Sequence, residues 1–207
     1  MGTSSVNAFC QNLSDDGALA GRECAGHERG QTTDVFDAGT AVHQAEMWSP
    51  ATQQFTRLAS MVVPRLYHST ALLLPDGRVL VAGGGRFNDV NQPTDQLSAE
   101  IYSPPYLFKG ARPVISSAPA AIHHATSFSL TTPDASQVTS VALLRVGAVT
   151  HAFDQNQRYV PLTFQQAPDG LTVHSPSSAK LAPPGYYMLF IVTSHGVPSV
   201  APMIKLK

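Results

Sequence analysis

The hydrophobic residues of this chain occur in short runs separated by glycine, proline and acidic turn residues. The clearest pair of runs, at 71–74 and 79–82, flanks Pro75-Asp76-Gly77, a strong signal for a tight hairpin turn. Alternation is visible at 141–146, and no stretch keeps the 3.6-residue period of an amphipathic helix over a useful length. Short runs between such turns predict an all-β protein.

An internal repeat extends this pattern. The sequence AEMWSP at 45–50 returns as AEIYSP at 99–104, and the hairpin lies between the two copies. This order of elements is typical of a kelch propeller blade. It consists of a strand, a DG turn, a strand ending in the glycines 83–85, and a strand with an aromatic Glu-x-Trp/Tyr motif. A degenerate copy starts at 7–10 and continues with Asp16-Gly17. We therefore expect a partial propeller of roughly one and a half blades, too few to close.

The sequence pattern changes near Arg112. From there on, short segments rich in β-forming residues recur at regular spacing. Six or seven such segments in about 95 residues predict a β-sandwich. We expect a degenerate blade remnant over 1–30, the last kelch blade region over 31–110, and a C-terminal β-sandwich over 111–207. The segments lie around 126–130, 140–146, 159–164, 170–174, 186–193 and 200–205.

Composition narrows the classes of partner. Charged residues make up 13% of the 207 residues, the net charge is −1, and no basic cluster is present. We therefore expect no binding of nucleic acid or of an anionic membrane surface. No apolar run reaches the roughly 18 residues that span a bilayer. The first five residues lack the basic and apolar parts of a signal peptide. Cys10 and Cys24 are too few for a disulfide framework, so composition leaves the compartment open.

Three motifs, in order, resemble the galactose oxidase and glyoxal oxidase family of copper radical oxidases. The resemblance covers about residues 30–207 and implies the last propeller blade followed by an immunoglobulin-like C-terminal domain. The first motif resembles the family's last-blade motif, the second its histidine loop and the third its final hairpin. The motifs are RLYHS at 65–69 with LLPDGRV at 73–79, VGAVTH at 146–151 with DQNQR at 154–158, and PPGYYMLF at 183–190 with GVPSVA at 196–201.

The resemblance implies a single copper ion held by two histidines, an axial tyrosine and a second tyrosine cross-linked to a cysteine. Carried over by motif, the axial tyrosine is Tyr67, and the two histidines are His68 and His151. Imidazole and phenolate suit Cu(II), and the Tyr67 phenolate is the candidate catalytic base for the substrate hydroxyl proton. Neighbours on a regular strand point to opposite faces. For Tyr67 and His68 to reach one metal, the strand must therefore end or twist there.

The cross-linked cofactor has an incomplete set of candidates. Phe9-Cys10 before Asp16-Gly17 resembles the family's cysteine motif, which makes Cys10 a candidate for the cross-link. No second tyrosine stands at a matching position, so we expect the radical cofactor to be absent or incomplete in this chain. We expect the isolated chain to be inactive, although the family oxidises primary alcohols or aldehydes and reduces O₂ to H₂O₂.

Simpler interpretations stand beside these. Without the motif, Tyr67 would be a packed blade tyrosine and His68 an exposed histidine, and His123-His124 is expected to be a solvated loop. As a whole, the chain is either part of an oxidoreductase acting on a small alcohol, aldehyde or carbohydrate, or a non-catalytic module that binds carbohydrate or protein. Fold alone does not separate the two. The resemblance implies an extracellular, secreted protein, and open blade edges favour self-association.

Overall fold

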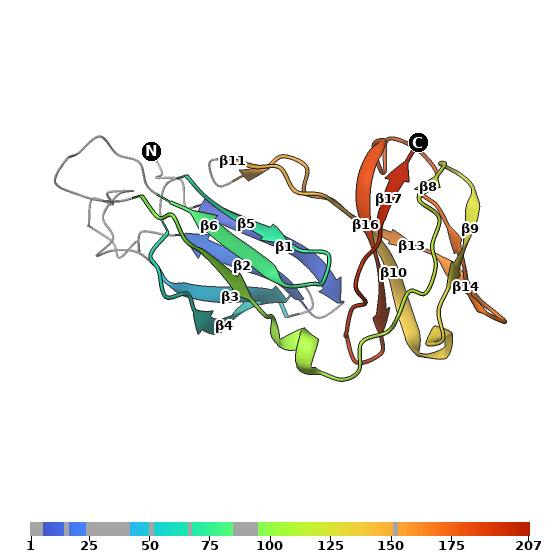
Figure 1. Cartoon of the computed structure of the whole chain (residues 1–207), viewed down its shortest axis with the longest axis horizontal. Helices are drawn as coiled ribbons and strands as arrows, with labels where there is room; N and C mark the ends of the chain where they lie inside the picture. The colour runs from blue at the N-terminus through green and yellow to red at the C-terminus, as the bar shows by residue number, and fades with distance from the viewer. Residues whose placement is uncertain are drawn as a thin grey trace.

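A computed structural model describes residues 6–14, 17–23, 42–49, 52–65, 68–84, 95–150 and 153–207. The regular secondary structure of the described chain is almost entirely β-strand, and its helical part is limited to two short 3-10 helices, η2 (Pro105–Phe108) and η3 (Ala135–Gln137). The predicted all-β fold is confirmed, and its open sheets are consistent with a partial propeller followed by a β-sandwich (Figure 1). In these ranges, no helix has the length and apolar character to cross a membrane.

The first sheet is a four-stranded antiparallel meander in the order β1-β2-β3-β4. Its strand β2 pairs with β3, so residues on both sides of position 30 share one sheet. Trp48 and Phe55 face each other across β3 and β4 with ring centroids 4.8 Å apart, an aromatic pair of the kind that stabilises neighbouring strands. The strands are β1 (Val6–Ser14), β2 (Gly17–Glu23), β3 (Gln44–Ser49) and β4 (Gln54–Ser60).

The second sheet has three strands, β5 (Ser69–Leu73), β6 (Val79–Gly83) and β7 (Ala99–Tyr102). The predicted hairpin at Pro75-Asp76-Gly77 joins β5 to β6. Gly77 has φ 79° and donates its N–H to the Leu74 carbonyl at 2.9 Å. Asp76 accepts bonds from the backbone N–H and the Nε of Arg78, at 3.0 and 2.7 Å. This turn therefore forms for local reasons, because its residues satisfy its own polar groups.

The C-terminal half packs a five-stranded sheet, β13-β10-β16-β17-β8, against a three-stranded sheet, β14-β15-β9. All strand pairs are antiparallel except β17 with β8. Between β10 and β13 the chain forms the two-stranded hairpin β11-β12. The strands are β8 (Ala121–Ile122), β9 (Ser127–Thr131), β10 (Val138–Arg145), β11 (Val149–Thr150), β12 (Phe153–Asp154), β13 (Tyr159–Leu162), β14 (Phe164–Ala167), β15 (Gly170–His174), β16 (Gly185–Thr193) and β17 (Met203–Leu206).

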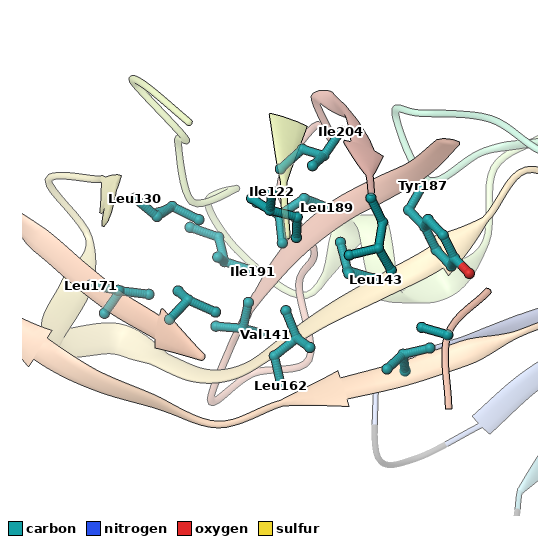
Figure 2. Close-up of a cluster of buried hydrophobic side chains, with 14 of the residues drawn as sticks. Ile122, Leu130, Val141, Leu143, Leu162, Leu171, Tyr187, Leu189, Ile191 and Ile204 are labelled. Carbon is teal, nitrogen blue, oxygen red and sulfur yellow. The ribbon is translucent and has the colours of Figure 1, made fainter. Parts of the chain in front are cut away.

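Buried aliphatic side chains from both sheets fill the sandwich (Figure 2). Leu130 and Leu171 extend from the smaller sheet toward Leu143, Leu189 and Ile191 of the larger one. These five side chains are at most 1% exposed. Burial to this degree stabilises the fold by roughly 1.5–3 kcal/mol per side chain.

The other face of β10 and β16 is also buried, because it packs on the three-stranded sheet β5-β6-β7, which we call the blade sheet. Leu144 and Phe190 belong to a second cluster that includes Ala71 and Val79 of the blade sheet. Tyr106 of η2 lies in the same cluster and donates its hydroxyl to the Gly77 carbonyl at 2.6 Å. Successive residues of a strand point to opposite faces, so these two strands build the sandwich core and the junction with the blades at once.

Candidate metal centre

His68 lies immediately before β5 and is exposed to solvent. Its backbone has φ 63°, the left-handed region that non-glycine residues rarely adopt. Regular strand geometry therefore ends at His68, and β5 starts one residue later, at Ser69. This is the break that the sequence requires if two neighbouring residues are to reach one metal. Tyr67 itself lies outside the described residues.

Gly83 supports the backbone of His68 from the neighbouring strand. It pairs with Ser69 across β5 and β6 and has φ 73°. A Cβ added at Gly83 would lie 2.8 Å from the His68 carbonyl oxygen. The first glycine of the triplet is thus required twice, for its positive φ and for the close approach of the His68 backbone.

Arg65 precedes this segment and is completely buried, with 0% of its surface exposed. Its Nη1 donates to the carbonyls of Gly83 and Ser98, both at 2.9 Å, and its Nη2 donates to the Ser98 hydroxyl at 3.0 Å. Its Nη2 also lies 3.6 Å from the carboxylate of Glu100. Its Nε is buried and has no hydrogen-bond partner in the described part of the chain. Arg65 therefore ties its own segment to the ends of β6 and β7.

Glu100 completes this arrangement. Its two carboxylate oxygens accept the backbone N–H groups of Val62 and Val63, at 2.8 and 3.1 Å. Burial acts to raise the pKa of Glu100, but these two hydrogen bonds and the charge of Arg65 outweigh burial and leave the pKa below its ordinary value. Glu100 is therefore held as a carboxylate, which is the form that Arg65 needs as a partner.

The hairpin β11-β12 carries the position of the second candidate histidine. His151 lies outside the described residues, but Thr150 and Phe153 on either side of it belong to β11 and β12. Asp154 closes the hairpin, because its Oδ1 accepts the N–H groups of Ala148 and Asn156 at 2.8 and 3.0 Å. A carboxylate that bonds both ends of a loop fixes the loop's shape.

This hairpin leaves the sandwich and lies against β5 (Figure 1). A Cβ added at Gly147 would lie 3.1 Å from Cδ2 of Leu72 and 2.9 Å from Oδ2 of Asp154. Gly147 therefore allows the base of the hairpin to pack closely on the middle of β5. A small crevice at this contact is lined by side chains from the blade sheet, the hairpin and the sandwich, including Ala71, Leu72, Arg145, Asp154 and Met188.

The remaining candidates are less well placed by the structure. Cys10 is a residue of β1, whose backbone pairs with Leu19 of β2, and β1 lies against β5. The position of the Cys10 side chain is outside what the structure describes. His124 is half-buried, with its two ring nitrogens 3.0 and 2.8 Å from the carbonyls of Lys207 and Ala182. Within the described ranges, no three His, Cys, Asp or Glu side chains gather to hold a metal ion.

No pattern in the sequence singled out the residues that support the two histidine-bearing segments. These residues are Arg65, Gly83, Glu100, Gly147 and Asp154. The glycine triplet and the RLYH motif were visible, but neither shows that Gly83 contacts His68 or that Arg65 bonds to Gly83. These contacts join positions 15 and 18 residues apart in the sequence, and they become evident only when the strands are paired.

Comparisons with known proteins agree with this architecture. Residues 17–106 match the family model for the glyoxal oxidase N-terminus, and residues 112–206 match that for the galactose oxidase-like early set domain. The structure superposes on a solved fungal alcohol oxidase of the AA5 family in complex with copper, with a TM-score of 0.82 and 33% identity. That match covers 97% of this chain and 42% of the other. The fold and its matches thus define the class of copper-dependent oxidases.

Curated relatives give the particular family. Galactose oxidase of Gibberella zeae is 34% identical over 178 residues, which cover 83% of this chain and 26% of that protein. Aldehyde oxidase GLOX of Vitis pseudoreticulata is 38% identical over 179 residues, which cover 76% of this chain and 33% of that protein. The chain belongs to the galactose oxidase and glyoxal oxidase family. It spans about a quarter to a third of the length of these curated relatives.

Proposed function

We propose that this chain is the copper-binding part of an oxidase of primary alcohols or aldehydes, with Tyr67, His68 and His151 as the metal ligands. The observation that carries the proposal is the contact between the β11-β12 hairpin and β5. It brings together two segments that are remote in the sequence, each of which carries one of the candidate histidines. A module that binds without redox chemistry remains the alternative, and it would not need the two histidines at this contact.

The course of the two segments supports a common site. The C-terminal end of β5 faces the sandwich, since the Pro75 carbonyl just beyond it accepts the Ala201 N–H at 2.8 Å. The hairpin leaves the sandwich next to Leu72 and extends along β5 in the opposite direction (Figure 1). His151 is four residues beyond Gly147, and His68 is four residues before Leu72. Extended chain covers about 13 Å in four residues, so we expect both histidines at the same end of β5.

The donor set fits copper. Two imidazoles and one phenolate are ligands that suit Cu(II) in a tetragonal arrangement, and His68 is exposed at a break in the strand. Copper bound there would supply the redox chemistry, in which an alcohol loses two electrons and two protons and O₂ gains them as H₂O₂. The Tyr67 phenolate would accept the hydroxyl proton of the substrate.

The family supports an extracellular, secreted protein with a kelch-type partial propeller before residue 111 and an immunoglobulin-like domain after it. The absence of a sequence match for the second tyrosine, with Cys10 alone as a cross-link candidate, favours copper binding without radical catalysis in this chain. The parent enzyme's substrates would then be small alcohols, aldehydes or carbohydrates.

Thermal unfolding with and without Cu(II) tests the proposal. Copper that binds only the folded chain at about 100 times Kd adds about 2.7 kcal/mol of stability. For a chain of this size that raises Tm by roughly 5–10 °C. We expect His68→Ala and His151→Ala each to abolish the rise. His195→Ala, at an exposed turn of the sandwich, is the matched control and should keep it. An equal rise in all four proteins would refute the ligand assignment.

A further inference from the structure

Arg65 is buried at a cost that simple packing does not require. Its side chain has no exposed surface, yet its Nε has no hydrogen-bond partner among the described residues. A well-packed apolar side chain could fill such a position without the desolvation of a charge. An unpaired buried polar atom in a folded protein calls for an explanation, and a functional role is one of them. An arginine differs from an apolar side chain in that its planar guanidinium group holds several hydrogen-bond acceptors in one fixed geometry.

The acceptors of Arg65 contact described residues on both sides of positions 66–67. We call Arg65, Gly83, Ser98 and Glu100 the Arg65 clamp. On the N-terminal side of positions 66–67, Glu100 holds the N–H groups of Val62 and Val63. On the C-terminal side, the Gly83 backbone lies directly against the His68 carbonyl.

Gly83 connects the two sides. Its carbonyl accepts Nη1 of Arg65 at 2.9 Å, and its Cα position allows the approach of His68 in the left-handed conformation. A change at Arg65 therefore reaches His68 through one intervening residue. Because the His68 conformation is strained, it requires support from its surroundings to persist.

We infer that the Arg65 clamp positions the metal-binding segment, with Arg65 acting through Gly83 on the backbone of His68. Arg65 is a positioning residue, since none of its contacts is with the metal ligands' side chains in the described structure. The inference rests on the proposed copper site. It predicts that the clamp sets the affinity and geometry of copper in addition to the stability of the blade sheet.

The first test compares Arg65→Lys with Arg78→Lys in the full chain. Lysine keeps the charge but cannot bond Gly83 and Ser98 through one planar fork. Arg78 also pairs with a carboxylate, Asp76, but in the turn at the far end of the same hairpin. We expect Arg65→Lys to weaken Cu(II) binding about 10-fold or more, because substitution of residues that support metal ligands typically has an effect of this size. Calorimetric titration measures the affinity, and the Cu(II) hyperfine splitting in electron paramagnetic resonance measures the geometry. Arg78→Lys should change neither.

The second test compares two glycines with the same backbone strain. Gly83 and Gly77 have φ 73° and 79°, so alanine is unfavourable at both. Only at Gly83 does the new Cβ meet the His68 carbonyl, at 2.8 Å. We expect both substitutions to lower the Tm of the metal-free chain. Only Gly83→Ala should also weaken copper binding and alter the resonance spectrum.

The possible outcomes are distinct. If the unaltered chain binds no copper, or binds it independently of His68 and His151, the proposed function and this inference both fail. If the unaltered chain binds copper through these histidines, and Arg65→Lys and Gly83→Ala lower only Tm, the inference fails and the proposed function stands. Should neither variant fold, Glu100→Gln carries the test, because it removes the ion pair and leaves Arg65 in place. Unchanged copper affinity and spectrum in Glu100→Gln would then overturn the inference.

Discussion

At the scale of single residues, the main feature of the candidate site is the buried Arg65 with the carboxylate of Glu100 beside it. Arg65 has three hydrogen bonds to Gly83 and Ser98 and a 3.6 Å ion pair with Glu100. Removing Glu100, whose side chain is 26% exposed, leaves the charge of the buried Arg65 without its ion-pair partner, which costs stability. We therefore expect the partners to be interdependent, and Glu100 offers a way to measure this through pH.

Glu100 should make stability depend on pH under acidic conditions. Its pKa in the folded chain is below the ordinary value of 4.5. The carboxylate therefore contributes stability that is present above that value and lost as the pH falls through the folded pKa. We expect Glu100→Gln to be less stable than the unaltered chain at pH 7 and the difference to shrink as the pH falls below 4.5. Urea unfolding of both proteins at pH 7 and at an acidic pH measures the difference in their free energy of unfolding. A difference that stays constant with pH would contradict the prediction.

At the scale of elements, the β11-β12 hairpin joins the two halves of the candidate site. Its shape depends on Asp154, which accepts two backbone N–H groups, and its docking depends on Gly147 against Leu72. The hairpin has two residues in each strand. Its own pairing is too short to hold it, because even longer isolated hairpins are only marginally stable.

Asp154 variants test whether the hairpin presents His151 to copper. Asp154→Ala removes both hydrogen bonds, and we expect copper to bind roughly 10-fold or more weakly. Asp154→Asn keeps an oxygen acceptor and should retain most of the affinity. Calorimetric titration of the two variants beside the unaltered chain measures the difference. Equal affinities in all three would show that the hairpin does not depend on Asp154, or that His151 is not a ligand.

At the scale of the whole molecule, we expect the copper-loaded chain to produce no H₂O₂ from a primary alcohol. The reaction moves two electrons, and the sequence offers no match for the second tyrosine of the family's radical cofactor. A peroxide assay with added Cu(II), an alcohol and O₂ measures this, with a full-length galactose oxidase as the positive control. Copper-dependent peroxide production that is lost in Tyr67→Phe would contradict the prediction.

Open sheet edges should also govern the association state. In the described structure β7 pairs only with β6, and 51% of Ile101 in β7 is exposed, as is 97% of Leu97 in the preceding segment. Exposed apolar edges recruit other strands. We expect light scattering to show oligomers of the unaltered chain at micromolar concentration and Ile101→Lys to shift them toward the monomer. Val200→Lys, at an exposed residue outside the strands, is the control. A clean monomer of the unaltered chain would contradict this expectation.

The sequence by itself determined the all-β class, the hairpin at Pro75-Asp76-Gly77 and the family. These features are local or are carried by motifs. A turn forms because its own residues satisfy its polar groups. A strand can be predicted from the alternation of apolar and polar residues within it. The segment 186–193 was visible as a strand. Its two faces, however, serve two different cores, since Leu189 lies in the sandwich and Phe190 at the junction with the blades.

Tertiary structure decided how the candidate site is held. Arg65 and Glu100 are 35 positions apart, and Leu72 and Gly147 are 75 apart. No pattern along the chain reveals that these pairs touch. Their contacts follow from the pairing of β5, β6 and β7 and from the packing of the sandwich on that sheet. The sequence can therefore name ligand types by motif. Their supporting contacts depend on the path of the folded backbone, because a metal site needs groups from several segments at one point in space.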